Sequence, residues 1–181
     1  MRRNGEFTVN IALMERDAEP LGPEGVASPV AGVVWAPARE LLYFAWRGGG
    51  AYRHDGAPGG FADAATRASA ARRLPLPAAP RPYTIVASRS HSSPETEEFI
   101  RAAEREHGRV ELASLGSALK ICLVAEGSAD AYPRFAPTME WDTAAGHAVA
   151  LEAGRVLVDP RNGAALRYNK ADLTNPWFLV R

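Results

Sequence analysis

Apolar and polar residues alternate along the first third of the chain in the pattern of β-strands. Residues 7–13 (FTVNIAL) carry an apolar side chain at every second position, which is typical of a half-buried strand. Apolar runs at residues 29–35 and 41–46 predict two more strands, and a short strand is expected at residues 51–53. The connector between the second and third runs has the length of a turn, which favours an antiparallel meander.

Three consecutive glycines, Gly48-Gly49-Gly50, allow two interpretations. Their bare backbone N–H groups can line a site for a phosphate. No helix pattern follows them, however, and the Lys-Ser/Thr pair of a P-loop is missing. A hairpin turn or a bulge is therefore favoured.

Residues 57–82 differ from their surroundings because they consist mostly of Ala, Pro, Arg and Gly. This composition predicts a connector between two domains, residues 1–56 and residues 83–181. Its arginines are expected to be solvated.

The second half of the chain alternates between strand and helix patterns. A helix is predicted to begin at Ser93-Pro94 and to end at Gly108, because serine caps a helix start, proline suits its first position and glycine suits its end. Two further helices are predicted at residues 118–126 and 142–153, and short strands at residues 83–87, 110–113, 129–132, 156–158 and 166–168. Together with the strands before it, this alternation predicts an α/β fold.

Composition narrows the class of protein. The 181 residues include 21 Lys and Arg and 21 Asp and Glu, and a neutral chain is a poor candidate for a dedicated nucleic-acid binder. The single cysteine, Cys122, excludes an internal disulfide framework and fits a reducing compartment. No apolar run approaches a membrane span, and the basic start is not followed by the apolar region of a secretory signal. We expect a cytoplasmic protein, with peripheral association to the inner face of the cell membrane left open.

Candidate functional residues lie near predicted helix starts. Asp142 can either cap its helix or hold a hard cation that bridges to a bound phosphate. Ser88 and His91 follow a strand and precede a helix, where they can hold a phosphate or a polar base, or simply cap the helix entry. Gly116 opens another helix start, and Lys120 there can reach a phosphate or remain a solvated lysine.

Other reactive side chains are expected to have structural roles. Cys122 lies in an apolar helix pattern, which favours a buried and inert thiol. The histidines at 54, 107 and 147 have no metal-ligand partners at suitable spacing, so we interpret them as surface or packing residues.

The sequence resembles the CysQ branch of the inositol monophosphatase superfamily, the 3′(2′),5′-bisphosphate nucleotidases, because several short motifs of that branch occur here in the same order along the chain. The Trp-Asp-x-Ala-Ala-Gly segment is specific to the superfamily, and Ser-Arg-Ser-His and Tyr-Asn-Lys point to the branch. The resemblance runs from about Asn4 to Phe178 and rests on residues 4–13, 88–91, 116–120, 131–134, 140–147 and 168–170.

The resemblance implies a layered α/β sandwich and Mg²⁺-dependent hydrolysis of the 3′-phosphate of adenosine 3′,5′-bisphosphate to AMP. It assigns Asp142 to the metal. It assigns Ser88, His91, Gly116 and Lys120 to the nucleotide, with Asp142 also at the substrate and Arg134 near the phosphate or sugar.

The resemblance also implies elements that do not appear in residues 1–181. The first metal motif of the family, Asp-Pro-Leu/Ile-Asp-Gly-Thr, and a metal-binding glutamate are expected before Asn4, so the catalytic residues stay unassigned. We expect little or no phosphatase activity from these residues alone, and an apolar sheet face that invites self-association or a complementing N-terminal fragment. The alternative is a non-catalytic remnant or nucleotide-binding half-protein.

Overall fold

The computed structural model describes residues 5–16, 27–56, 59–60, 63–87 and 93–181. Its N-terminal part is a five-stranded antiparallel sheet in which strands follow one another in chain order. The first four strands confirm the predicted meander, and the fifth was not predicted. The sheet comprises β1 (Val9–Arg16), β2 (Ala27–Ala36), β3 (Leu41–Trp46), β4 (Gly50–Asp55) and β5 (Arg72–Arg73), with the 3₁₀ helix η1 (Pro37–Arg39) between β2 and β3.

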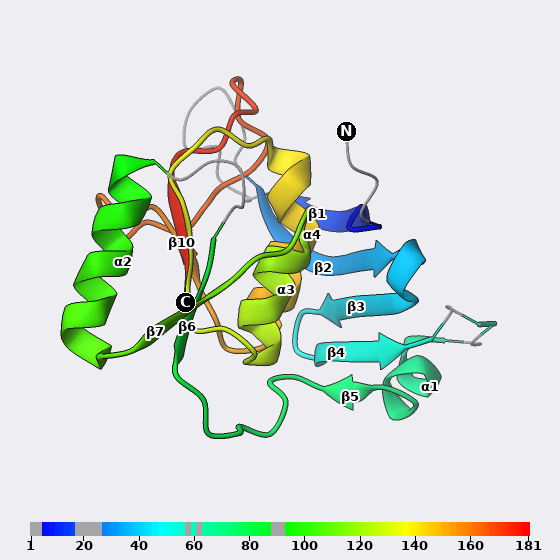
Figure 1. Ribbon diagram of the computed structural model, residues 1–181. Helices are drawn as coiled ribbons and strands as arrows, with labels where there is room; N and C mark the ends of the chain where they lie inside the picture. Colours follow the sequence, from blue (N-terminus) through cyan, green and yellow to red (C-terminus); the bar gives the residue numbers. More distant parts are fainter. Residues whose placement is uncertain (1–4, 17–26, 57–58, 61–62, 88–92) are drawn as a thin grey trace.

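Two helices, α3 (Leu119–Glu126) and α4 (Glu140–Glu152), lie between this sheet and the rest of the molecule (Figure 1). The approach of α4 to β2 requires small residues on both sides. A Cβ atom on Gly32 would lie 2.3 Å from the backbone oxygen of Ala145, and one on Gly146 would lie 3.1 Å from Ile121 of α3. The small residues of α4 therefore allow its close packing against two elements.

The second half adds a layer of short strands and an outer helix. The strands β6 (Tyr83–Val86) and β7 (Val110–Ala113) are parallel, and β10 (Phe178–Val180) lies between β8 (Tyr132–Arg134) and β9 (Leu157–Val158). A parallel bridge from Ile85 to Ala131 joins the two groups. The helix α2 (Pro94–His107) covers them on the side away from α3 and α4 (Figure 1). The predicted layered α/β sandwich is confirmed.

The residues predicted to begin and end helices in this half do so in the structure. The Ser93 hydroxyl accepts a hydrogen bond from the N–H of Thr96 at 3.3 Å, and Pro94 is the first residue of α2. Gly108 and Gly127 follow α2 and α3 with φ angles of 75° and 84°, which glycine adopts without steric strain.

Some predicted elements differ from the structure. Residues 166–168 form no strand, because Tyr168 makes only an isolated bridge to Ala27. The strand predicted at residues 129–132 begins instead at Tyr132, and α4 begins at Glu140, two residues earlier than predicted. The strand β10 had no alternating pattern to reveal it, since all three of its residues are buried.

The alanine- and arginine-rich segment contains secondary structure in its described part. The helix α1 (Ala64–Ser69) is capped by Asp63, and β5 pairs with β4 of the five-stranded sheet. The segment therefore contributes an edge strand to the N-terminal sheet. The division of the chain into two domains stays a prediction.

One face of the five-stranded sheet packs on α4, and the opposite face, here called the outer face, carries exposed apolar side chains. On β1, Val9 is 47% exposed, Ile11 63% and Leu13 64%. On β3 and β4, the rings of Phe44, Trp46 and Tyr52 stack at centroid distances of 5.3–6.3 Å. The expected apolar sheet face is present.

Candidate functional site

The first turn of α4 brings Asp142 to the surface of a cavity. Met139 is the residue before the helix, and its backbone N–H donates to Asp142 Oδ2 at 2.9 Å. Asp142 is therefore not the N-cap residue that one interpretation of the sequence proposed: Met139 holds that position, and the Asp142 carboxylate reaches back to it from the third residue of the helix. Its second oxygen, Oδ1, has no hydrogen-bond partner among the described residues and is available to a ligand.

The cavity, here called the polar cavity, has a volume of about 190 Å³ and lies between α3, β8 and α4. Its polar side chains come from segments far apart in the sequence. They are Ser117, Lys120, Arg134, Thr138, Asp142 and Thr143. Two basic groups and one carboxylate give the cavity a net positive charge at neutral pH, which suits an anionic ligand.

Lys120 is held in the polar cavity by partial burial. Its Nζ donates to the carbonyl of Leu115 at 3.3 Å and lies 5.6 Å from the ring centroid of Tyr132. Burial and then the nearby Arg134 guanidinium lower the pKa of Lys120 to about 8, while Glu6 and Asp142 oppose that shift. Lys120 is therefore cationic at neutral pH and is poorly compensated until an anion binds.

Arg134 contributes the second positive charge. One guanidinium nitrogen, Nη2, donates to the carbonyl of Pro137 at 3.2 Å. Its Nε atom is buried and has no partner among the described residues. A buried N–H group without a partner is unfavourable, so this group is also poised to donate to a ligand.

The segment around Gly116 packs against the N-terminal segment that carries Glu6. A Cβ atom on Gly116 would lie 2.8 Å from the Cβ of Glu6 and 3.2 Å from its backbone oxygen. The next residue, Ser117, shares a hydrogen bond with Thr8 through their hydroxyl groups. Gly116 therefore has a packing role at the edge of the polar cavity, and its contact with a nucleotide stays a prediction.

Ser88 and His91, the other two predicted substrate residues, lie outside the described residues. Of the predicted site residues, the structure brings Lys120 and Asp142 together on one cavity, with Gly116 directly before Ser117 of that cavity.

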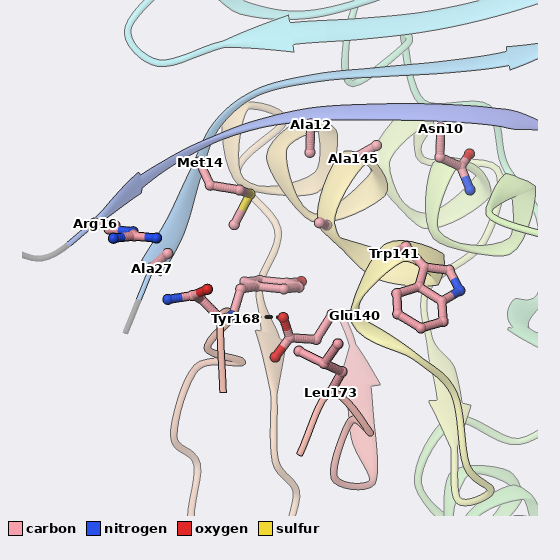
Figure 2. A pocket seen from close by; sticks show the side chains of 12 residues that line it. Asn10, Ala12, Met14, Arg16, Ala27, Glu140, Trp141, Ala145, Tyr168 and Leu173 are labelled. Atoms are coloured by element: carbon pink, nitrogen blue, oxygen red, sulfur yellow. Dashed lines mark hydrogen bonds between the residues drawn. The ribbon is translucent and has the colours of Figure 1, made fainter. Parts of the chain in front are cut away.

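A second, mostly apolar cavity of about 440 Å³ lies on the other side of the first turn of α4. Figure 2 shows it between Ala12 and Met14 of β1 and Tyr168 and Leu173 of the C-terminal segment, with Trp141 at one side.

Glu140 attaches the Tyr168-Asn169-Lys170 segment to the start of α4. Its carboxylate accepts backbone hydrogen bonds from Asn169 at 2.7 Å and from Lys170 at 3.2 Å, and it forms an ion pair with the Lys170 ammonium group. These contacts attach the C-terminal segment to the first residue of α4, close to the polar cavity.

The cysteine and two of the histidines have the structural roles that the sequence predicted. Cys122 is fully buried, and burial raises the pKa of its thiol. His147 is a buried packing residue with its Nδ1 2.9 Å from the Tyr168 hydroxyl, and His107 is an exposed residue that stacks on Tyr83. No helix in the described part of the chain is long and apolar enough to cross a membrane.

The triple glycine forms the turn between β3 and β4, which confirms the hairpin interpretation. The N–H groups of Gly48 and Gly50 donate to the two carboxylate oxygens of Glu152 at 3.2 and 3.0 Å. The turn does bind an anion, but that anion is a side chain of the protein itself.

The described residues do not by themselves make a metal site. They contain no group of three or more His, Cys, Asp or Glu side chains placed to hold an ion. Asp142 can supply one oxygen ligand through Oδ1, whereas Mg²⁺ takes about six. Among the described residues, we therefore assign only Asp142 as a ligand for Mg²⁺.

Sequence reasoning missed three residues near the site, Thr138, Thr143 and Asn175. Thr138 had a readable signal, since a hydroxyl before a helix start is a common capping residue. Asn175 had none, because its contact with the helix start joins segments far apart in the chain.

The fold and the polar cavity define an α/β protein with a small cavity at a helix start, lined by two cationic side chains and one carboxylate. The chain belongs to the inositol monophosphatase family, whose family model matches residues 1–178. Enzymes of this family are metal-dependent.

The most informative relatives are bacterial proteins named CysQ. The 3′(2′),5′-bisphosphate nucleotidase CysQ of Escherichia coli (strain K12) is 39% identical over 181 residues, which cover 99% of this chain and 62% of the relative. The crystal structure of CysQ from Bacteroides thetaiotaomicron matches with a TM-score of 0.86 and 50% identity, over 99% of this chain and 64% of that chain.

A staphylococcal inositol monophosphatase structure matches with a TM-score of 0.57 and 22% identity over 86% of this chain and 53% of that chain, which supports the fold alone. The chain thus spans a little over three-fifths of the length of the CysQ relatives.

Proposed function

We propose that this chain supplies the nucleotide- and phosphate-binding part of a Mg²⁺-dependent phosphatase that hydrolyses the 3′-phosphate of adenosine 3′,5′-bisphosphate to AMP. The observation that carries the proposal is the meeting of Lys120, Arg134 and Asp142 on one cavity. The names of the CysQ relatives support the substrate class.

The residues of the polar cavity act by binding and orientation. Lys120 and Arg134 offset the negative charge of a phosphate group, and the low pKa of Lys120 means that an anion there restores its preference for the charged form. Asp142 would hold Mg²⁺ through Oδ1 together with ligands from outside the described residues. When bound, the metal supplies charge stabilisation and an activated water to the reaction.

The test combines ligand binding with hydrolysis. Residues 1–181 are expected to bind AMP in titration calorimetry and to release little or no phosphate from adenosine 3′,5′-bisphosphate with Mg²⁺. Lys120→Met is expected to remove AMP binding. The proposal fails if AMP produces no binding heat at millimolar concentration, or if Lys120→Met binds it as the wild type does.

The outer face supports a second proposal, that this chain associates with another polypeptide, either a second copy or a complementing N-terminal fragment. Its exposed Val9 and Ile11 line a hollow of about 550 Å³ on the sheet, and Leu13 is exposed on the same strand. Light scattering after size-exclusion chromatography is expected to show a mass above the monomer's 19.4 kDa. Ile11→Lys is expected to restore the monomer, and a wild-type monomer would contradict self-association.

We also propose a cytoplasmic location, with peripheral contact to the inner face of the cell membrane. The free and buried Cys122 supports a reducing compartment. Cell fractionation tests it. Recovery of the chain in the periplasmic or extracellular fraction would contradict the cytoplasmic location, and its absence from the membrane fraction would contradict the peripheral contact.

The alternative, a non-catalytic nucleotide-binding protein, shares the binding result. It differs in hydrolysis when metal ligands from outside residues 1–181 are present. Adding the N-terminal portion of a CysQ relative is expected to restore Mg²⁺-dependent phosphate release, and Asp142→Asn is expected to abolish it. Binding without any restored hydrolysis would favour the alternative.

A further inference from the structure

Asn175, in the segment before β10, makes an unusual number of contacts with the turn before α4. It is 5% exposed, and its backbone N–H donates to the carbonyl of Thr138 at 2.8 Å. Its side-chain Nδ2 lies 3.1 Å from Thr138 Oγ1, 2.8 Å from the carbonyl of Met139 and 3.1 Å from Thr143 Oγ1. One amide therefore connects three residues at the edge of the polar cavity.

The chemistry of these contacts determines where the Thr143 proton points. Thr143 Oγ1 donates to the carbonyl of Glu140 at 3.2 Å and accepts from the Tyr168 hydroxyl, so the two hydrogens of Asn175 Nδ2 can go to the Met139 carbonyl and to Thr138 Oγ1. Its single hydrogen is used inside the protein, so Thr143 offers no donor to a ligand.

Thr138 is in the opposite state. Its Oγ1 accepts from Asn175 Nδ2, which can only donate, and its own hydrogen has no acceptor among the described residues. Thr138 is also partly exposed and lines the polar cavity with Lys120 and Arg134. The hydroxyl is thus held by its oxygen with its hydrogen free, as a donor for an anion requires.

We propose that the Thr138 hydroxyl donates a hydrogen bond to a phosphate oxygen of the ligand in the polar cavity, and that Asn175 is the positioning residue that holds it there. The inference rests on the proposed function of this cavity and adds a neutral, directional donor to the two cations. The ammonium group of Lys120 is a flexible point charge and does not fix one phosphate oxygen, whereas a held hydroxyl and the planar Arg134 guanidinium can each direct a hydrogen bond to a particular oxygen.

Two substitutions at Thr138 test the donor directly. Thr138→Val keeps the shape and removes the hydroxyl, whereas Thr138→Ser keeps the hydroxyl. Loss of a hydrogen bond to a charged group predicts roughly a tenfold or larger rise in the Kd for AMP in Thr138→Val, with near wild-type affinity in Thr138→Ser. Thr174→Val is the matched control, because Thr174 adjoins the same turn but does not line the cavity.

Inorganic phosphate is the second probe. A contact with the phosphate group weakens both AMP and inorganic phosphate in Thr138→Val, whereas weakening of AMP alone assigns the contact to the sugar or base and overturns the inference. If Thr138→Val binds as the wild type while Lys120→Met loses binding, the inference fails and the proposed function stands. If the wild type and Lys120→Met are alike in not binding either probe, both fail.

The positioning role of Asn175 needs a readout that general loss of structure does not move. Asn175→Ala is expected to weaken AMP binding in the wild-type background and to have no further effect in the Thr138→Val background. Equal weakening in both backgrounds would show a general structural role and overturn the positioning claim. If Asn175→Ala fails to fold, Asn175→Asp, which keeps the size but removes both N–H donors, enters the same cycle and decides it by the same two outcomes.

Discussion

The side chain of Asp142 and the backbone of Met139 are joined by a 2.9 Å hydrogen bond that closes the first turn of α4. One carboxylate thus has two tasks, since Oδ2 completes the helix start while Oδ1 remains available at the polar cavity. The hydrogen bond at the helix start and the ligand interpretation of this aspartate are therefore compatible, and substitutions can separate them.

Asp142→Ala removes both tasks, whereas Asp142→Asn keeps an oxygen that can accept from Met139. Loss of the helix-start hydrogen bond predicts that Asp142→Ala lowers the free energy of unfolding by about 1 kcal/mol, with a smaller loss for Asp142→Asn. Urea unfolding monitored by circular dichroism measures both. Equal losses in the two variants would show that charge, and not the acceptor, stabilises the turn.

Lys120→Met tests whether the charged lysine that is proposed to bind an anion lowers the free energy of unfolding of the protein. Burial lowers the pKa of Lys120 from 10.5 to about 8, so the charged lysine opposes folding at neutral pH, and this penalty declines as the pH rises from about 8 to 10.5. We expect Lys120→Met to raise the free energy of unfolding at pH 7 by about 1 kcal/mol. Urea titrations at pH 7 and pH 10 check this, and a destabilised variant at pH 7 would refute it.

His147 predicts a loss of stability in acid. Burial lowers its pKa from 6.5 to about 4, so as the pH falls through this window the unfolded chain gains a proton that the folded chain does not. The expected loss is about 3 kcal/mol between pH 7 and pH 4.

His147→Asn is the control, because its amide nitrogen can replace Nδ1 as the partner of Tyr168. The variant is expected to lose less stability than the wild type between pH 7 and pH 4 in urea titrations. Identical pH dependence in the two proteins would show that His147 is not the group that titrates.

Gly32→Ala tests the close contact between β2 and α4. A Cβ atom at this position would lie 2.3 Å from the carbonyl oxygen of Ala145, which is backbone and cannot rotate away. Displacement of α4 is expected to lower the free energy of unfolding by about 1–3 kcal/mol or more. Gly60→Ala is the matched control, since nothing lies within 4 Å of its added Cβ, and thermal unfolding of the two variants should differ clearly.

Parts of the fold followed directly from local sequence signals. The strand at Leu41–Trp46, the start of α2 at Pro94 and the helix ends at Gly108 and Gly127 depend on periodicity, capping and glycine geometry, which neighbouring residues determine. Elements without such signals were missed. The fully buried β10 shows no alternation, and the alanine- and arginine-rich composition around α1 and β5 concealed them.

The candidate site was predicted only in part, for a related reason. Asp142 and Lys120 were found because each stands near a helix start inside a segment with a family resemblance. The role of Asn175 was not found, because a hydrogen bond to Thr138 depends on how the C-terminal segment returns to α4.

The sequence by itself determined most of the helices and strands, the family that the chain resembles and the charged residues near helix starts, because these properties depend on residue type and short spacing. Only the tertiary structure decided what those residues meet. Glu152 accepts the N–H groups of the glycine turn, Glu6 lies so close to Gly116 that only glycine fits there, and Asn175 donates to the Thr138 hydroxyl. Each of these contacts joins segments far apart in the chain, and close packing with satisfied buried polar groups, rather than local propensity, selects them.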